Sequence, residues 1–592
     1  MVPMADSHRA DYRRGEPVWA VTSVGVMGCR LSLVLIVCAI AAAPASAAAP
    51  VTLMPGVSVQ QGVQFTLHGP VAISVITTPA PGFQSGLFAL TPVTATGSLT
   101  GGRLRLTQIE SALSSQATVV GINGDYSAGK AGLPAGILMQ GGALEHTPLP
   151  LRSSIGIDQA GTLHVDRVSF AGTWRGTGQR RPLVGVNQVA GRNQVVLLTP
   201  AYGAAAPVVA GSVEAVLEPF AAAATGVDLQ ATVTAVGSGG GEAIPPDGAV
   251  LQATGTAAAA LTAEAPAGQA VTIRLILPSA WAGVVSALGG GPVLVRSGKA
   301  IFRSGEDFTS DQISDRDARA AVGQLADGRI ILVTVDGGQT GYSVGMTSFE
   351  LAQTMVRLGA VTACAVESGG AVTAAFDGRL LNRPSDSGGE RPIAEALLLE
   401  YFGVYAPPPP VPLVNGDAGA DAEPLQYKLV RPSTVTAELI GPDGAAHVIE
   451  SNVTHPPGTY SNTAADFDKD GDWHWEVTAT DDLHRMSIAY RTFRVDSTLR
   501  GLVVPAARGS ATVRFTLGRP AKVALRIETT GGVTVRALPA VQLQPGVRRL
   551  IWDGTLPGGA RAPSGTYVAH VYATSDVGTS DLRATFGFTI AK

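Results

Sequence analysis

The sequence predicts an α+β N-terminal domain, with a mixed sheet and few helices, followed by two all-β sandwiches. An apolar, β-branched run at 330–335 ends at Asp336, as a buried strand does where it enters a turn. Thr347 and Glu350 have the spacing of a capping box ahead of apolar residues at helical spacing. Beyond the proline run 407–410, short alternating segments separated by turn signals recur, which is typical of β-sandwiches.

Length and charge narrow the possible functions. The 592 residues are enough for three or four domains of roughly 150 residues each. Charged residues make up only 15% of the chain and the net charge is −4, so there is no basic footprint of a nucleic-acid-binding protein. We therefore expect a weakly charged, loop-rich, largely β protein that does not bind nucleic acid.

The segment 1–47 is predicted to be a signal peptide. Arg30 precedes the apolar run 31–43, and Ala45-Ser46-Ala47 supplies a small-x-small cleavage pattern. The run is too short for a comfortable membrane span, so cleavage is favoured over anchoring. Either Met1 or Met27 is the start. We expect a mature chain that begins near Ala48 and is secreted or held at the surface of a bacterial cell.

The first strands and turns follow in order. Alternating apolar positions over 55–77 indicate two strands, and 104–113 is a candidate short helix. The run 118–126 is predicted to be a buried strand that enters the turn Asn123-Gly124-Asp125. Asn-Gly is also a strong hairpin dipeptide, so a plain turn and a functional site are both open for this motif.

Three blocks of the N-terminal part resemble the phosphodiester glycosidase family (N-acetylglucosamine-1-phosphodiester alpha-N-acetylglucosaminidase-like domain). They are Ile122-Asn-Gly-Asp-Tyr126, the block from Val335 to Thr347 with Asp336-Gly337 and Ser343-Val-Gly-Met-Thr, and Asn382-Arg-Pro-Ser continuing through Gly389-Glu-Arg391. The resemblance covers roughly 50–405, and we place the domain at 48–405. It implies hydrolysis of the bond between a sugar and a phosphodiester in an extracellular or cell-surface glycan.

The family block L-D-G-G-G-S is altered in this chain, where it reads Val366-Glu-Ser-Gly-Gly-Ala371. Glu367 replaces the Asp, Ser368 replaces the first Gly and Ala371 replaces the Ser. An aspartate-to-glutamate change moves a carboxylate by about one methylene, and a misplacement of ~1 Å can cost ~100-fold in rate. An enzyme is favoured. The alternative is a degenerate member that binds phosphorylated glycan or serves as a cell-surface structural module.

The resemblance also implies the site residues. The candidate catalytic carboxyls, whose roles as acid or base stay open, are Asp125, Asp336, Glu367 and Glu390. The candidate substrate-binding residues are Asn123, Gly289, Gly290, Gly291, Arg319, Asn382, Arg383 and Arg391. Arg319 is the first choice for the phosphodiester clamp, because a planar guanidinium holds two phosphate oxygens at once; a surface arginine is the alternative. No cofactor is required.

The C-terminal part begins after a proline-rich linker at 406–412. The opening of 413–500 resembles the loops that precede many secreted bacterial Ig-like modules, and alternating strands follow. Asp466, Asp468 and Asp470 resemble a calcium loop. An EF-hand would need Glu where Val477 stands, so calcium and a plain acidic turn are both open.

The last segment, 501–592, is predicted to be a second sandwich. Ile551-Trp-Asp-Gly-Thr555 and Pro563-Ser-Gly-Thr-Tyr567 resemble the Ig-like domain of flagellar hook-capping proteins. That module recurs at the C-termini of exported bacterial proteins, so the resemblance implies an accessory spacer or cell-envelope docking domain without a flagellar role. We expect 411–592 to fold without the N-terminal domain.

Overall fold

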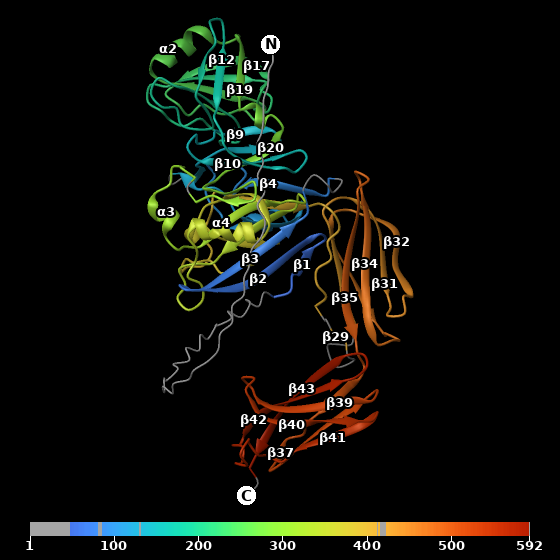
Figure 1. Cartoon of the computed structure of the whole chain (residues 1–592). Coiled ribbons are helices and arrows are strands. Elements are labelled where there is room, and N and C mark those ends of the chain that lie inside the picture. Colours follow the sequence, from blue (N-terminus) through green and yellow to red (C-terminus); the bar gives the residue numbers. More distant parts are fainter. Residues whose placement is uncertain are drawn as a thin grey trace, which may run out of the picture. The chain divides into compact units, whose positions relative to one another are not determined.

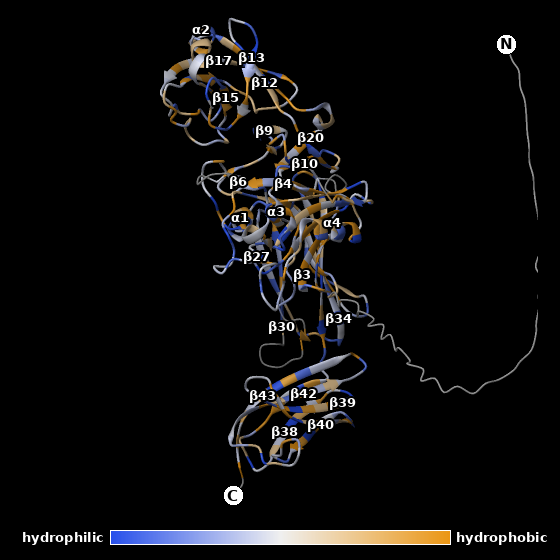
Figure 2. Ribbon diagram, turned by 60° about the vertical axis from the view of Figure 1, so that its left-hand side comes forward, coloured by the Kyte–Doolittle hydropathy of each residue, from blue (hydrophilic) through white to orange (hydrophobic). Residues whose placement is uncertain are grey.

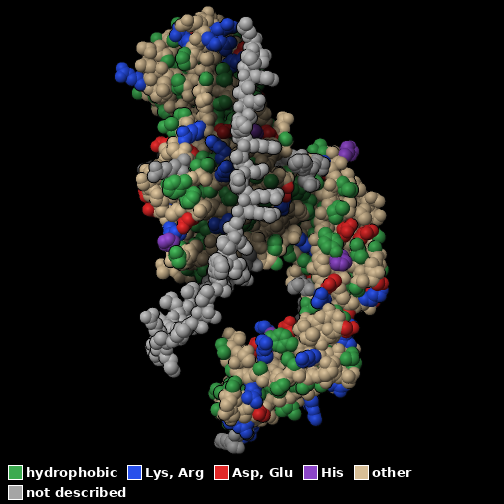
Figure 3. Space-filling view, in the orientation of Figure 1, with side chains coloured by type: hydrophobic (Ala, Val, Ile, Leu, Met, Phe, Trp, Pro, Cys, Tyr) green, Lys and Arg blue, Asp and Glu red, His purple; other side chains and the backbone are tan. Residues whose placement is uncertain are grey.

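The computed structural model describes residues 48–80, 86–128, 132–302, 304–410, 413–414 and 422–590. The predicted signal peptide and most of the loop 415–423 lie outside the described residues. Within them the chain is mostly β, as predicted, and no helix is long and apolar enough to cross a membrane. Uncharged side chains and backbone make up most of the face shown in Figure 3, in keeping with the low charge of the sequence.

The sheet that carries the predicted site has eight strands, and β1 to β3 lie side by side in it (Figure 1). In spatial order the strands are β1 (Val51–Met54), β2 (Val57–Thr66), β3 (Gly69–Thr78), β24 (Ile330–Val335), β23 (Arg319–Leu325), β25 (Ala360–Ala365), β21 (Val293–Arg296) and β22 (Lys299–Ala300). Every neighbouring pair is antiparallel. The predicted mixed sheet is therefore wrong for this part of the chain.

The helix α4 (Ser348–Arg357) explains that difference. It connects β24 to β25, and these two strands run in the same direction, but β23 lies between them and is antiparallel to both. The capping box is confirmed, because Thr347 Oγ1 accepts the Glu350 N–H and the Glu350 carboxylate accepts the Thr347 N–H. The helix packs against β21, β22 and β25.

Two five-stranded sheets complete the surroundings of the site. One is β27 (Arg379–Leu380), β26 (Ala374–Phe376), β5 (Thr118–Asn123), β28 (Glu395–Tyr401) and β4 (Phe88–Thr94). The other is β11 (Leu163–Arg167), β10 (Ser153–Asp158), β20 (Val284–Gly289), β8 (Leu138–Gln140) and β9 (Ala143–His146). Side chains from both sheets and from the eight-stranded sheet form one buried apolar cluster, which fixes their strand ends relative to one another.

The middle of the chain forms a second eight-stranded sheet with its own apolar core. Its strands are β13 (Arg181–Leu183), β12 (Ala171–Arg175), β19 (Ala270–Ile276), β17 (Asp228–Ser238), β16 (Val213–Glu218), β18 (Ala249–Ala253), β15 (Val195–Leu198) and β14 (Gly185–Val186). A short ribbon is made by β6 (Ser127–Ala128) and β7 (Leu133–Pro134). The alanine run at 257–260 forms helix α2 (Gly255–Glu264), because alanine has the highest helix propensity.

The remaining helices are short. The candidate helix at 104–113 is confirmed as α1 (Leu106–Leu113), and α3 (Ser310–Ser314) was not predicted. Two single turns of 3₁₀ helix occur at Ser279–Trp281 and Gly369–Ala371. The second begins two residues after Glu367.

The C-terminal part consists of sheets in pairs. The first pair is β29 (Leu413–Val414), β35 (Met486–Val495), β34 (Gly471–Asp481), β31 (Ser433–Ile440) and β32 (Ala446–His455), with β30 (Ala422–Leu429) and β33 (Gly458–Ala465). The second pair is β36 (Leu499–Val503), β38 (Ala511–Leu517) and β41 (Gly546–Trp552), with β37 (Ala507–Arg508), β43 (Thr579–Thr589), β42 (Gly565–Thr574), β39 (Ala521–Thr529) and β40 (Thr534–Leu543).

Each pair of sheets shares one buried cluster. Burial alternates along β43, and in Figure 2 the hydropathy colour changes along the same strand, as expected when one face of a strand packs on a core. The Ig-like strand order and the domain boundaries stay predictions. Val404 and Ala406, placed before and at the start of the predicted linker, are buried in the cluster of the first pair.

Candidate functional site

The ends of β24 and β25 place two of the predicted carboxyls at one edge of a sheet. Val335 pairs with Arg319 and Ala365 pairs with Ala321, both at the beginning of β23. Asp336 and Glu367 follow these strand ends within two residues. The turn after Val335 and the segment after Val366 therefore meet at one edge of the sheet.

Asn123 joins this edge to the neighbouring five-stranded sheet. Its Nδ2 donates to the Glu367 carbonyl at 2.8 Å, and its Oδ1 accepts the Thr373 N–H at 3.2 Å. The Glu367 N–H in turn donates to the Gly124 carbonyl at 3.1 Å. Asn123 is fully buried, and together with Gly124 it fixes both backbone polar groups of Glu367 beside the segment that carries Asp125.

Asp125 is a buried carboxyl in a very tight setting. Its Oδ2 accepts the Gly136 N–H at 2.7 Å, and a Cβ added at Gly289 would lie 2.0 Å from the same oxygen. Only glycine fits there, so Gly289, the first residue of the glycine run 289–291, lets the chain pack around Asp125. Burial raises the pKa of Asp125 to about 6, and the Arg152 charge limits that rise.

Glu367 has the most reactive setting of the four predicted carboxyls. It is half-buried, and within the described part of the chain no donor is bonded to its carboxylate. Burial and the neighbouring Asp125 raise the pKa of Glu367 to about 7, while the charges of Arg391 and Arg103 act in the opposite direction. A carboxyl with a pKa near neutrality and no fixed partner can both take up and release a proton.

Glu395 is a third acidic group of this cluster, after Asp125 and Glu367, and the sequence analysis missed it. It lies at the start of β28, is 1% exposed, and its Oε1 accepts the N–H of Asp125 at 3.1 Å. Burial, with Asp125 next in effect, holds the pKa of Glu395 well above its usual range. The signal in the sequence was a glutamate at the start of an apolar strand, because glutamate is almost never fully buried unless it is paired.

Three arginines surround the carboxyl cluster. Arg391 is exposed and makes a two-bond pair with Asp386, at 2.7 and 2.8 Å, while its charge still reaches Glu367. Arg103 acts on Glu367 from the loop before α1. Arg152, which was not predicted, lies over the rings of Tyr126 and Phe308 at 5.1 and 4.4 Å.

The altered family block contributes a contact of its own. Ser368, where the family has Gly, places its Oγ 3.4 Å from the Tyr126 hydroxyl. Ala371, where the family has Ser, is fully buried in an apolar cluster. The replaced side chains are thus accommodated in the fold around Glu367.

Arg319 is buried and bonded to the backbone, so its guanidinium is not open to a ligand. Its guanidinium donates to three backbone carbonyls, those of Met346, Gln312 and Asp315, at 2.9, 2.7 and 2.7 Å, and the residue is 3% exposed. These bonds tie α3 and the loop before α4 to the edge of the sheet. The geometry therefore does not favour the predicted phosphodiester clamp at Arg319, and a phosphate has better access to Arg391.

We expect Arg319→Lys to lower the free energy of unfolding by about 2 kcal/mol or more, because lysine cannot supply all three carbonyls and buried acceptors are left unpaired. Chemical denaturation checks this. Arg391→Lys is the control and should unfold like the wild type, because exposed ion pairs contribute little. Wild-type stability of Arg319→Lys together with weaker substrate binding would instead restore the clamp.

Asp336 organises a polar network next to the cluster. Its carboxylate accepts bonds from the Tyr342 hydroxyl, Asn382 Nδ2 and the Arg383 N–H, at 2.9, 2.9 and 3.1 Å. Burial raises the pKa of Asp336, and these donors counteract the rise. Since its oxygens are already used, Asp336 fits the role of a loop anchor better than that of an acid or base.

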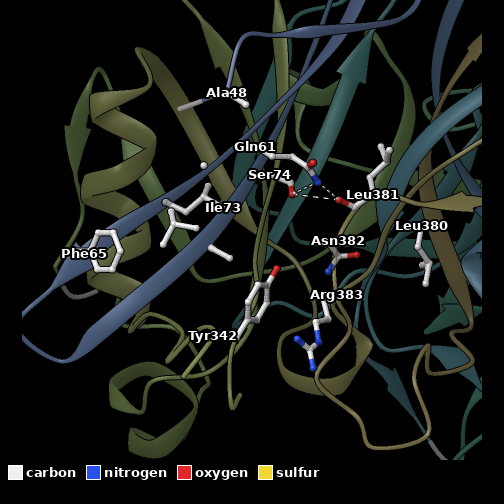
Figure 4. A pocket seen from close by; sticks show the side chains of 13 residues that line it. Ala48, Gln61, Phe65, Ile73, Ser74, Tyr342, Leu380, Leu381, Asn382 and Arg383 are labelled. Atoms are coloured by element: carbon white, nitrogen blue, oxygen red, sulfur yellow. Dashed lines mark hydrogen bonds between the residues drawn. The ribbon is translucent and has the colours of Figure 1, made fainter. Parts of the chain in front are cut away.

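A pocket of about 530 Å³ opens beside this network. Figure 4 shows Tyr342, Asn382 and Arg383 lining it, with Gln61 and Ser74 bonded to the Leu381 carbonyl. The Arg383 guanidinium lies 4.9 Å from the centre of the Tyr342 ring. The predicted binding residues Asn382 and Arg383 thus line a cavity. Both also donate hydrogen bonds to the Asp336 carboxylate.

Glu390 belongs to a helix terminus. Its two carboxylate oxygens accept the N–H and the hydroxyl of Thr107 at 2.9 and 2.7 Å, in the first turn of α1. A carboxylate there stabilises the orphan N–H groups and the positive end of the helix dipole. The structure therefore favours a capping role for Glu390 over the predicted catalytic one.

The acidic turn at Asp466, Asp468 and Asp470 does not present three free carboxylates. Both oxygens of Asp470 are engaged, with Ser497 and with Arg519. Across the described residues no three His, Cys, Asp or Glu side chains converge as a metal site would require. Calcium binding at this turn stays a prediction without a described donor set.

The fold and the site together define a β-rich protein whose sheet-edge loops hold a carboxyl cluster flanked by arginines. Residues 222–400 match the family model described as phosphodiester glycosidase, and 504–576 match the FlgD Ig-like domain. Both predicted resemblances are confirmed over these residues. Glu367, Glu395 and Arg391 lie within the matched residues, whereas Asn123, Asp125 and Arg152 precede them.

Individual relatives cover parts of the chain. The SPbeta prophage-derived uncharacterized protein YomE of Bacillus subtilis is 29% identical over 99 residues, which are 17% of this chain and 15% of that protein. A hypothetical protein from Synechocystis has a similar fold, with a TM-score of 0.50 at 23% identity over 61% of this chain and 64% of its own.

A zebrafish structure was also matched: the catalytic domain of N-acetylglucosamine-1-phosphodiester alpha-N-acetylglucosaminidase, auto-inhibited by its pro-peptide. It has a TM-score of 0.30 at 14% identity, over 59% of this chain and 84% of its own. The chain spans 15% of the Bacillus protein and 64% of the Synechocystis protein, which is less than two thirds of each. What the chain does as a whole is therefore a matter of proposal.

Proposed function

We propose that this protein is a secreted hydrolase that cleaves the bond between a sugar anomeric carbon and a phosphodiester oxygen in an extracellular or cell-surface glycan. The observation that carries the proposal is Glu367, a half-buried carboxyl with a pKa of about 7 beside Arg391 and Arg103. It lies within the region that matches the phosphodiester glycosidase family. The FlgD Ig-like region at the C-terminus is proposed to dock the protein to the cell envelope.

The leaving group decides which role Glu367 is given. Cleavage releases a phosphate monoester, whose second pKa is about 6, so it departs without needing a proton at neutral pH. The attacking water, in contrast, must lose one. We assign Glu367 as the general base: water attacks the anomeric carbon, its proton passes to the Glu367 carboxylate, and the C–O bond breaks with its electron pair remaining on the phosphate oxygen.

The surrounding arginines fit the charge that this reaction develops. The departing oxygen gains negative charge, and guanidinium groups set beforehand at that position stabilise the transition state. Arg391 is exposed at the rim of the cluster, and Arg152 is half-exposed above Tyr126. Arg103 is the third cation near the carboxyl cluster. Tyr126 and Phe308, which lie with their ring centres 5.8 Å apart, offer aromatic surface to the sugar.

The assignment predicts the direction of the pH dependence. A base must be ionised, so kcat/KM should rise with pH through about 7, the pKa of Glu367 in the free protein, and then level off. Initial rates of sugar release measured across this range check it. A value of kcat/KM that instead falls above about pH 7 would show Glu367 acting as an acid.

The proposed activity is tested with the purified protein and a panel of sugar-1-phosphodiesters. Release of reducing sugar from at least one member is the expected result. Saturable binding of the panel without any release would favour the alternative, a degenerate member that binds phosphorylated glycan. Neither binding nor release would contradict both.

A further inference from the structure

Two buried carboxylate oxygens next to Glu367 have no hydrogen-bond donor among the described residues. They are Asp125 Oδ1 and Glu395 Oε2. The other oxygen of each carboxyl is satisfied by backbone, Asp125 Oδ2 by Gly136 N–H at 2.7 Å and Glu395 Oε1 by the N–H of Asp125 at 3.1 Å. Both residues are almost completely buried, at 3% and 1% exposure. An unpaired buried carboxylate oxygen is costly, and here there are two.

The surroundings offer these oxygens no full set of counter-charges. Arg152 is the cation that acts on Asp125, and Tyr126, Cys364 and Glu367 are its other titratable neighbours. The groups that face Glu395 are Asp125, Glu145 and Glu367, all acidic. Two ionised carboxylates would therefore repel each other here without compensation.

The packing also keeps the two carboxyls together. A Cβ at Gly124 would lie 2.7 Å from Cγ of Glu395, and one at Gly136 would lie 2.8 Å from Asp125 Oδ2. The Asp125 N–H bond to Glu395 joins the two residues directly. These contacts hold both side chains against closely packed backbone, so they cannot turn away into solvent.

We propose that Asp125 and Glu395 share one proton, so that they form a buried acid–carboxylate pair with a single negative charge beside Glu367. One carboxyl then donates an O–H bond to the other, which satisfies both unpaired oxygens at once. Carboxyl pairs that cannot both ionise behave in this way. The raised pKa values of both groups agree with the arrangement.

The pair has a consequence for the proposed function, on which this step rests. Its negative charge helps to hold the pKa of Glu367 near 7, which makes Glu367 a stronger base than an ordinary glutamate. Asp125 and Glu395 then act as positioning residues through charge and need not touch the substrate. The existence of the pair itself does not depend on any activity.

Amide substitutions test how many negative charges the pair carries. Glu395→Gln offers an N–H to Asp125 Oδ1 in place of the proton, so the pair keeps one negative charge, and Asp125→Asn does the same from the other side. The titration of Glu367, followed by ¹³C NMR of labelled carboxyls and assigned with Glu367→Gln, should stay near 7 in each single variant. In the double variant it should shift downward, because the charge is gone.

Other outcomes of the titration overturn the proposal. A downward shift in each single variant would show that both carboxyls are ionised in the wild type. An unchanged titration in the double variant would show that the pair carries no charge. Neither reading uses turnover, so the pair can fail while sugar release stands, and sugar release can fail while the pair stands.

Infrared spectroscopy of the wild type gives a second test that needs no variant to fold. Above about pH 8, ordinary carboxyls and groups such as Glu367 and Glu145, with pKa about 7, are ionised. The C=O stretch of a protonated carboxylic acid should still be present. It should keep its intensity in the control Glu145→Gln and lose intensity in the double variant Asp125→Asn/Glu395→Gln, where the remaining signal comes from Glu110, whose pKa burial also holds well above its usual range. An unchanged intensity in the double variant overturns the proposal. Absence of this band from the wild type overturns the proposal.

Discussion

Glu367→Gln is expected to lower kcat/KM for sugar release by about 100- to 10,000-fold, the usual contribution of a general acid or base. The amide keeps the shape of the side chain but cannot accept the proton of the attacking water. Binding of an unreactive phosphonate analogue should change little, because Arg391 and Arg152 remain in place. Initial rates and calorimetric binding measure the two effects separately.

Glu145→Gln is the matched control for that change. Burial raises the pKa of Glu145 to about 7 as well, but its side chain lines a different cavity, beside α1 and β8. It should therefore retain wild-type rates. Equal losses in both variants would mean that removing any buried carboxyl of this region is harmful, and the specific role of Glu367 would be wrong.

Gly289→Ala should give the second large effect. The new methyl group would lie 2.0 Å from Asp125 Oδ2 and 2.8 Å from the Gly136 Cα, so both Asp125 and the backbone must move. Overpacking of this kind costs about 1–3 kcal/mol of stability, and a displaced Asp125 also changes the charge next to Glu367. Thermal unfolding and sugar release should both decline.

Gly388→Ala supplies the comparison for this prediction. A Cβ at Gly388 meets no atom within 4 Å, and its φ is not in the left-handed region. It should behave like the wild type in both measurements. If Gly289→Ala also did so, the close packing of the glycine run on Asp125 would have no part in the site.

Local signals in the sequence were sufficient to predict the strand and the helix that precede Glu367 in the chain. The apolar run at 330–335 coincides with β24, and the Thr347–Glu350 capping box begins α4. These features depend on neighbours within a few residues, so periodicity and capping rules reveal them. Asp336 and Glu367 meet at one edge because β24 and β25, the strands before them, run in the same direction on either side of β23.

The roles of individual side chains depended on partners that no local rule supplies. Arg319 was expected to bind phosphate, but three carbonyls from two segments surround it. Glu390 was expected to be a catalytic carboxyl, but it caps α1 by accepting the N–H of Thr107, which lies 283 positions earlier in the chain. Glu395 and Arg152 were missed because only the folded chain brings β28 and the loop before β10 to the same cluster.

The central claim is that this site requires the phosphate of its substrate. Wild type and Glu367→Gln should be compared on a sugar-1-phosphodiester and on a simple alkyl glycoside of the same sugar, by the initial rate of sugar release. Release is expected from the phosphodiester by the wild type alone, with the alkyl glycoside unreactive for both proteins. Equal release from both substrates, or equal rates for both proteins, would contradict the claim.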